Sequence, residues 1–182
     1  TVQRETAGNP FFTAELLQHL TSTGQLERAL EGDAEPHLSV PESVTDVVTQ
    51  RLERLAAGAT DVLRIGALIG LTFDVDLVAD VAGIPADDVL DVLEGVARAG
   101  LVNEVGVDRF AFVHAIVRTA LLDELSESRR ARAHRKVAEA LESRGADQFD
   151  ELARHWQLAG VDSNSTKYLA RAAERDMVAL AY

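Results

Sequence analysis

Residues 86–113 read ADDVLDVLEGVARAGLVNEVGVDRFAFV, a stretch in which a helical pattern gives way to a β pattern. The first half repeats apolar residues at helical spacing, which predicts a helix over residues 86–99. Gly100 comes next, and glycine is the residue that most often follows the last turn of a helix. Two β-rich runs, at residues 101–105 and 109–113, are joined through a glycine and predict a hairpin.

Two shorter helical patterns precede this stretch, at residues 60–69 and 76–82. Thr60 is the expected N-cap of the first of them, and residues 72–74 are expected to form a short extended link. Helices followed by a two-stranded hairpin are the layout of a winged helix. We therefore assign residues 39–125 to a winged-helix domain.

Four more helical patterns follow the hairpin. They are expected at residues 114–125, 128–143, 148–159 and 165–180. Ser126 or Ser128 can cap the second of them. Small and apolar residues in the last two recur at the spacing of packed antiparallel helices, so we interpret residues 126–182 as the start of a TPR-like helical solenoid. One or two units establish no repeat period, and the fold class we expect is mainly α.

The composition excludes several classes of protein. The chain has 18 Lys and Arg residues against 30 Asp and Glu residues, and its net charge of −12 opposes nonspecific attraction to nucleic acid or anionic membranes. It has no cysteine, hence no disulfides or thiolate metal ligands, which favours a cytoplasmic location. No apolar run reaches the ~20 residues of a membrane-spanning helix.

The turn Gly8-Asn9-Pro10-Phe11-Phe12 opens a helix that we expect to run to about residue 20. Proline suits the first turn of a helix because it lacks a backbone N–H. A plain helix start explains this turn, and so does the adenine-side edge of a nucleotide site whose catalytic half lies upstream. The chain carries no glycine-rich phosphate-binding loop, so we expect it to be a fragment of a larger protein.

The helix over residues 86–99 is the one that a winged helix would place on DNA. Its polar face carries four carboxylates and one cation: Asp87, Asp88, Asp91, Glu94 and Arg98. Carboxylates in this position would be repelled by the phosphates of a duplex. Direct DNA reading is therefore disfavoured.

One basic cluster begins the helix over residues 128–143. It comprises Arg129, Arg130, Arg132, Arg135 and Lys136. These side chains spread around the helix, with Glu127 and Glu139 nearby, so a solvated helix face is the simplest interpretation. Contact with an acidic surface of the same protein and contact with a phosphate are the alternatives.

None of the five histidines has the i, i+4 partner and nearby carboxylate of a zinc-binding helix, so no metal site is expected. His114 differs from the others because it lies where the second hairpin strand gives way to a helix. The free backbone N–H groups of a helix N-terminus favour anions, and Arg118, one turn later, can join His114 on a phosphate. A capping or buried histidine is the simpler account from these residues alone.

The order of these elements resembles that of the STAND-class signalling ATPases. The residues that carry the resemblance are Gly8-Asn9-Pro10-Phe11-Phe12, the start of the winged helix at Val40-Pro41-Glu42-Ser43-Val44, and Arg109-Phe110-Ala111-Phe112-Val113-His114 with Arg118. Within that class the chain looks like the LuxR-type transcriptional regulators. The resemblance covers residues 6 to about 145, and each motif is weak alone.

The resemblance implies a switch controlled by ATP or ADP, bound only when an upstream P-loop ATPase domain is present. Residues 1–38 would then be the lid segment of that domain, Pro10 would contact the adenine, and His114 would contact the ADP β-phosphate with Arg118 beside it. Related ATPases usually follow this histidine with aspartate, whereas this chain has Ala115. The lock of the closed state would therefore be weaker or differently built.

The function that we expect is that of a regulatory relay in transcription, without catalytic residues or bound cofactor in the fragment alone. Its partners would be the upstream ATPase domain, a downstream output domain, and an inducer that is either a protein or a small molecule, with no membrane contact. A helical interaction scaffold without nucleotide function is one alternative. A winged-helix DNA-binding domain, of the helix-turn-helix kind, is the other.

Overall fold

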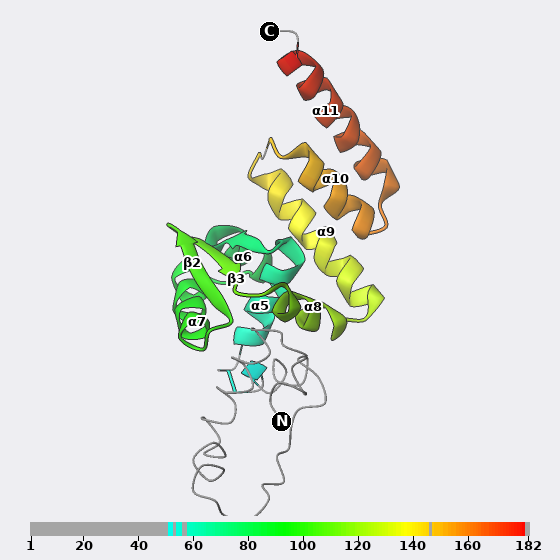
Figure 1. Cartoon of the computed structure of the whole chain (residues 1–182). Coiled ribbons are helices and arrows are strands. Elements are labelled where there is room, and N and C mark those ends of the chain that lie inside the picture. The colour runs from blue at the N-terminus through cyan, green and yellow to red at the C-terminus, as the bar shows by residue number, and fades with distance from the viewer. Residues whose placement is uncertain (1–50, 53, 56–57, 146, 181–182) are drawn as a thin grey trace, which may run out of the picture. The chain divides into compact units, whose positions relative to one another are not determined.

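The computed structural model describes residues 51–52, 54–55, 58–145 and 147–180 (Figure 1). For residues 178–180 it describes the backbone alone. The predicted segment 1–38 with Pro10 lies outside the described residues, as do most of residues 39–57, the first part of the predicted winged-helix domain. From Leu55 onward the described chain forms one compact unit. Within this unit the chain is mainly helical, with one small antiparallel sheet, as the sequence predicts.

The elements of this unit, in chain order, are α5 Ala59–Ile69, β1 Thr72–Asp74, α6 Val75–Ala82, α7 Ala86–Arg98, β2 Val102–Gly106, β3 Arg109–Phe112, α8 Ala115–Asp123, α9 Glu127–Ser143, α10 Phe149–Leu158 and α11 Asp162–Leu180. Each helix lies within a few residues of its predicted position, and the predicted hairpin is β2–β3. None of the described helices is both long enough and apolar enough to cross a membrane.

The sheet has three strands rather than the two expected from the sequence, in the order β1-β3-β2. Residues 72–74 are extended, as expected for this link, but they also pair with β3 as a third strand, which the sequence did not predict. Phe73 pairs with Phe110 across β1 and β3, and both side chains are buried. Three residues are too few to show the alternation that marks a strand. They form a strand because β3 lies beside them and its backbone N–H and C=O groups pair with theirs.

Gly66, in the middle of α5, lets β1 approach that helix closely. A Cβ at this position would lie 3.0 Å from the ring of Phe73, which is closer than such atoms normally come. Phe73 also packs against Phe112, with ring centroids 5.2 Å apart. The glycine therefore positions the first strand, although glycine weakens a helix interior by about 1 kcal/mol relative to alanine.

The helix caps differ in one place from the expectation. The N-cap of α5 is Gly58, whose φ is 86°, and not Thr60. This left-handed conformation suits glycine, and it starts the helix early enough to bury Ala59. Asp74 caps α6 by accepting a hydrogen bond from the backbone N–H of Leu77, and Ser126 caps α9.

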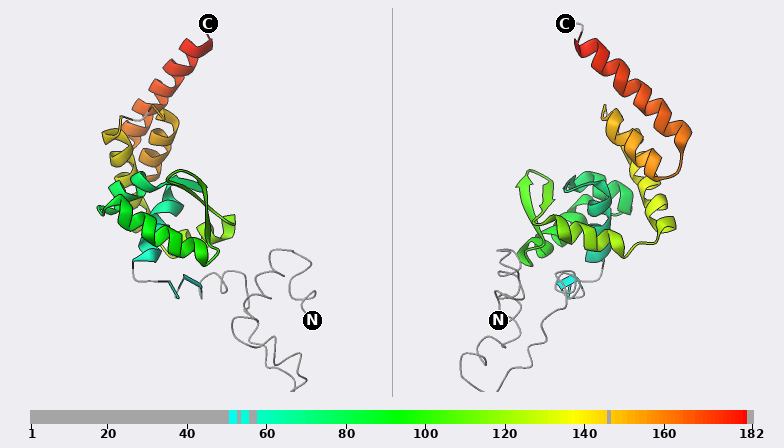
Figure 2. Two further views of the ribbon diagram at one scale, coloured as in Figure 1. Left: turned by 90° about the vertical axis from the view of Figure 1, so that its left-hand side faces the viewer. Right: turned by 45° about the vertical axis from the view of Figure 1, so that its right-hand side comes forward.

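The remaining helices pack in succession onto the region that contains the sheet. Helix α8 packs on α5, and α9 packs on both α5 and α6. Helix α10 packs on α9 and α11 packs on α10, which continues the chain away from the sheet (Figures 1 and 2). Tyr168 of α11 also reaches back to donate a hydrogen bond to Glu142 of α9. The predicted domain boundary at residues 125 and 126 stays a prediction.

Candidate functional site

The predicted nucleotide-site residues in the described region are His114 and Arg118. His114 is the residue before α8, with extended backbone (φ −141°, ψ 141°), and its side chain forms no capping hydrogen bond to that helix. It is partly exposed. Pro10, their predicted companion, is outside the described residues, so its distance from His114 stays a prediction.

Arg118 turns toward α5. Its Nε donates a hydrogen bond of 2.7 Å to the backbone carbonyl of Ala67. Burial lowers the pKa of Arg118, and the neighbouring positive charge of Arg154 lowers it further. The guanidinium remains charged at neutral pH because the ordinary pKa of arginine lies far above neutrality. This contact ties α8 to α5, and the sequence did not predict it.

Arg154 of α10 makes a matching contact two residues further along α5. Its Nη2 donates to the carbonyl of Ile69 over 2.8 Å. The last carbonyls of a helix lack partners inside it and carry partial negative charge, and α5 has no basic residue in its own last turn. Arginines from two other helices therefore supply the donors and the positive charge that this helix end lacks.

Beside these arginines lie two buried histidines, His134 of α9 and His155 of α10. Their Nδ1 atoms are 3.0 Å apart, and Nη2 of Arg154 lies 3.0 Å from Nε2 of His155. The geometry assigns the tautomers, since arginine can only donate. Nε2 of His155 must accept from Arg154, so His155 carries its proton on Nδ1 and donates it to His134.

Both histidines are neutral in the folded protein. His155 is fully buried and His134 is 5% exposed. Burial lowers the pKa of His134 to about 4 and that of His155 to about 3, and the nearby charge of Arg154 acts in the same direction. A proton added to Nδ1 of His134 would also set two N–H groups against each other. We call Arg118, Arg154, His134 and His155 the helix-end cluster.

Sequence reasoning missed the helix-end cluster, although one signal was present. His134 stands at helical spacing from Val137, Ala138 and Leu141, which are all buried, so it belongs to the apolar stripe of α9. A histidine in such a stripe predicts burial. Its partner, 21 residues away on another helix, is selected only when α9 and α10 pack together.

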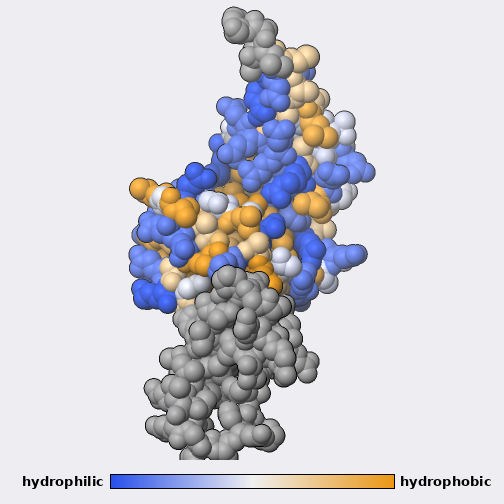
Figure 3. Space-filling view, viewed as in Figure 1, coloured by the Kyte–Doolittle hydropathy of each residue, from blue (hydrophilic) through white to orange (hydrophobic). Residues whose placement is uncertain are grey.

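The four carboxylates that the sequence predicts on one face of α7 are accessible to solvent. Asp87, Asp88, Asp91 and Glu94 are all exposed. The tip of the β2–β3 hairpin is apolar, with Val105 58% and Val107 87% exposed, and Figure 3 shows this apolar group at the edge of the molecule. Each surface carries one exposed cation, Arg98 on α7 and Arg109 on the hairpin, which is too few to attract a DNA backbone strongly.

Two residues of the basic cluster on α9 make contacts within the unit. Nη2 of Arg130 donates to the carbonyl of Leu122 over 2.6 Å, at the end of α8, and Arg135 lies 3.8 Å from Glu139. Arg129, Arg132 and Lys136 are exposed. Among the described residues no group of three or more His, Asp or Glu side chains is placed to hold a metal ion.

Comparison with known proteins adds no identification. No model of a protein family matches the chain, and no curated protein matches it.

Proposed function

We propose that this chain is the regulatory relay of a nucleotide-switched signalling ATPase of the STAND class, in a transcriptional regulator of the LuxR type. It would act in the cytoplasm, between an upstream ATPase domain that binds ATP or ADP and a downstream output domain. In this proposal residues 39–125, which include α5 to α8, are a winged-helix domain, and residues 126–182 begin a TPR-like solenoid.

The order of elements supports the winged-helix assignment. A helix, a short strand, two helices and a hairpin follow one another as α5-β1-α6-α7-β2-β3, and β1 closes the sheet against β3. The acidic face of α7, the second helix after β1, argues against DNA as its ligand. The domain is better suited to contacts within its own protein.

The observation that carries the proposal is the shared anchorage of α8 and α10. Arg118 of α8 and Arg154 of α10 hydrogen-bond carbonyls two residues apart at the end of α5. His114 begins the same helix that holds Arg118. A phosphate drawn to the N-terminus of α8 would therefore act on a helix that is connected, through α5, to the C-terminal helices.

The sensor role of His114 is tested in the full-length protein, including the proposed ATPase domain. We expect His114→Ala to weaken ADP binding about tenfold or more, because a charge-assisted contact to a phosphate would be lost. Thr119→Ala, an exposed change on the same helix, is the matched control and should bind ADP normally. Equal affinities of wild type and His114→Ala would exclude the sensor role, and absence of any ADP binding would favour the interaction scaffold.

The relay itself is tested by hydrogen exchange of the full-length protein with and without ADP. We expect ADP to slow exchange in α8 and α10 together. Arg118→Met should keep most of the ADP affinity and the effect on α8, but lose the effect on α10. An unchanged effect on α10 would show that the coupling does not pass through the end of α5.

A titration with duplex DNA separates the relay from a DNA-binding domain. At physiological salt the 182-residue chain should not bind, because the exposed face of α7 is acidic. Submicromolar binding that weakens with salt would favour the DNA-binding alternative.

A further inference from the structure

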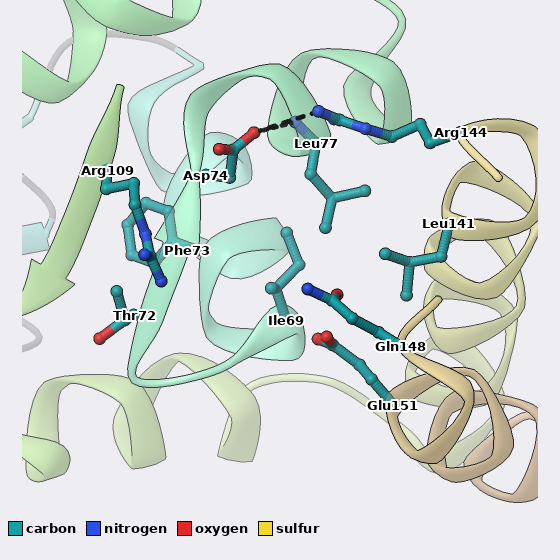
Figure 4. Close-up of a pocket in the computed structure, with 10 residues that line it drawn as sticks. All are labelled: Ile69, Thr72, Phe73, Asp74, Leu77, Arg109, Leu141, Arg144, Gln148 and Glu151. Carbon is teal, nitrogen blue, oxygen red and sulfur yellow. Dashed lines mark hydrogen bonds and ion pairs between the residues drawn. The ribbon is translucent and has the colours of Figure 1, made fainter. Parts of the chain in front are cut away.

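A cavity of about 400 Å³ lies between the sheet and the C-terminal helices (Figure 4). This volume falls in the ~300–1,000 Å³ range of small-molecule sites. Ile69, Leu77 and Leu141 supply apolar wall from α5, α6 and α9. The cavity therefore combines elements that are far apart in the chain, and it lies apart from His114.

Besides Thr72, three polar side chains that line this cavity form no hydrogen bond to another described residue: Arg109 of β3, and Gln148 and Glu151 at the start of α10. Figure 4 shows Arg109 running beside Phe73, with the other two reaching toward the same space from the opposite side. Each of the three carries hydrogen-bonding capacity that the described protein leaves unused.

Glu151 is the most buried of the three, since Arg109 and Gln148 are exposed. Its carboxylate is 4.0 Å from Arg154 and 3.9 Å from Nε2 of His155, beyond hydrogen-bonding distance. Burial raises its pKa, with Arg154 opposing the change. A positively charged donor in the cavity would offset the cost of keeping this carboxylate ionised.

The other charges at the cavity are already paired with each other. Arg144, at the end of α9, lies 3.4 Å from Asp74 and 3.3 Å from Asp80. Asp74 also accepts the capping hydrogen bond of α6. These groups close one side of the cavity. Of the remaining charged side chains that line it, Arg109 has no ionic partner among the described residues, and Glu151 has only the 4.0 Å contact with Arg154.

We propose that this cavity is a binding site for a small zwitterion with an aliphatic body, of the aliphatic amino acid class. Its carboxylate binds the guanidinium of Arg109, its ammonium group binds Glu151, and its side chain lies on Ile69, Leu77 and Leu141. Gln148 supplies an additional hydrogen bond. Such a ligand would join the start of α10 to the sheet. The inference rests on the cavity alone and does not require the proposed nucleotide function.

The probes are L-leucine, L-isoleucine and L-valine, titrated into the 182-residue chain and followed by nuclear magnetic resonance. Ligands this small are expected to bind with a Kd on the order of 1 mM. Two analogues of leucine test the two ends: 4-methylpentanoate lacks the amine and isopentylamine lacks the carboxylate. Each should bind at least tenfold more weakly than leucine.

The residues are tested with Arg109→Gln and Glu151→Gln, which remove charge but keep most of the side chain. Each should weaken leucine binding tenfold or more, while Glu94→Gln on the exposed face of α7 should not. Circular dichroism and urea unfolding check that the variants remain folded. His114→Ala should bind leucine normally, which separates this site from the nucleotide proposal.

The proposal is overturned if none of the three amino acids binds saturably. It is also overturned if the one-ended analogues bind as well as leucine, or if folded Arg109→Gln and Glu151→Gln proteins keep full affinity.

Discussion

The interior of the α5–β3 region and its contact with α9 and α10 are built from different chemistry. The interior contains apolar side chains such as Leu63, Leu93 and Phe110, all nearly inaccessible to solvent. The contact contains the helix-end cluster, where two arginines and two histidines are hydrogen-bonded to α5 and to each other. Apolar burial is insensitive to pH and has no preferred direction, whereas the polar contact depends on protonation and on the orientation of each partner.

This difference indicates which part of the unit can respond to a signal. Apolar packing contributes most of the free energy of folding, and it tolerates change poorly because interiors are close-packed. A polar contact contributes less, but removing one partner leaves the others buried and unpaired. We therefore expect the largest losses of stability in the interior and the most condition-dependent losses at the helix-end cluster.

The largest effect is expected for Phe110→Ala in the interior. Phe110 is 1% exposed in the central strand β3, and truncating such a side chain costs about 3–5 kcal/mol through lost burial and a cavity. Urea unfolding of the purified chain measures the change in the free energy of unfolding. Val107→Ala, at the exposed hairpin tip, should change it by less than about 0.5 kcal/mol. A loss below about 1 kcal/mol for Phe110→Ala would show that burial of this side chain contributes little to stability.

Acid should weaken the helix-end cluster selectively. The two histidines have pKa values of about 4 and about 3 when folded, against about 6.5 when unfolded. Well above pH 6.5 the histidines are neutral in both states, so their contribution to stability is constant. As the pH falls below 6.5 the unfolded chain binds protons that the folded chain refuses, and stability falls.

At pH 5 this loss should be about 2 kcal/mol for each histidine. Urea midpoints measured from pH 8 to pH 5 test it, with the His134→Leu, His155→Leu double variant as the comparison. The double variant removes both titrating groups, so its stability should depend less on pH. Parallel curves for the two proteins would show that the histidines are not the source.

Arg118→Met should cost about 1.5–3 kcal/mol, because a charged donor is lost and the carbonyl of Ala67 is left without it. Urea unfolding at pH 7 measures this loss. Arg132→Met, an exposed change in α9, is the control and should stay within about 0.5 kcal/mol. If the two variants are equally stable, the anchorage of α8 on α5 contributes nothing measurable.

The smallest effect is expected for Arg144→Met. Its ion pairs with Asp74 and Asp80 are partly exposed, and pairs of this kind are worth about 0–1 kcal/mol. The difference from wild type should shrink between 50 mM and 1 M salt, at about the concentrations where screening becomes complete. A loss of stability that is larger than that of Arg118→Met, or independent of salt, would contradict this prediction. It would show that the ion pairs of Arg144 behave as buried interactions.

Much of the fold followed from local patterns. The apolar stripe of α7, its stop at Gly100 and the β-rich runs of the hairpin were each legible over a few residues, and the structure confirms them. The strand at residues 72–74 could not be predicted from the sequence, because it depends on pairing with β3. The N-cap at Gly58 could not be predicted either, because it depends on a left-handed backbone conformation. The sequence did not predict the contact of Arg118 with α5, and the expected role of this residue at a phosphate stays a prediction.

By itself, the sequence determined that the described unit is mainly helical, where its helices begin and end to within a few residues, and that α7 exposes carboxylates. Periodicity and caps act within one or two turns, so they are readable from the chain. Only the tertiary structure decided that Arg118 and Arg154 meet the end of α5, that His134 meets His155, and that Arg109 faces Glu151 across a cavity. These pairs join residues on separate elements, and packing alone selects them.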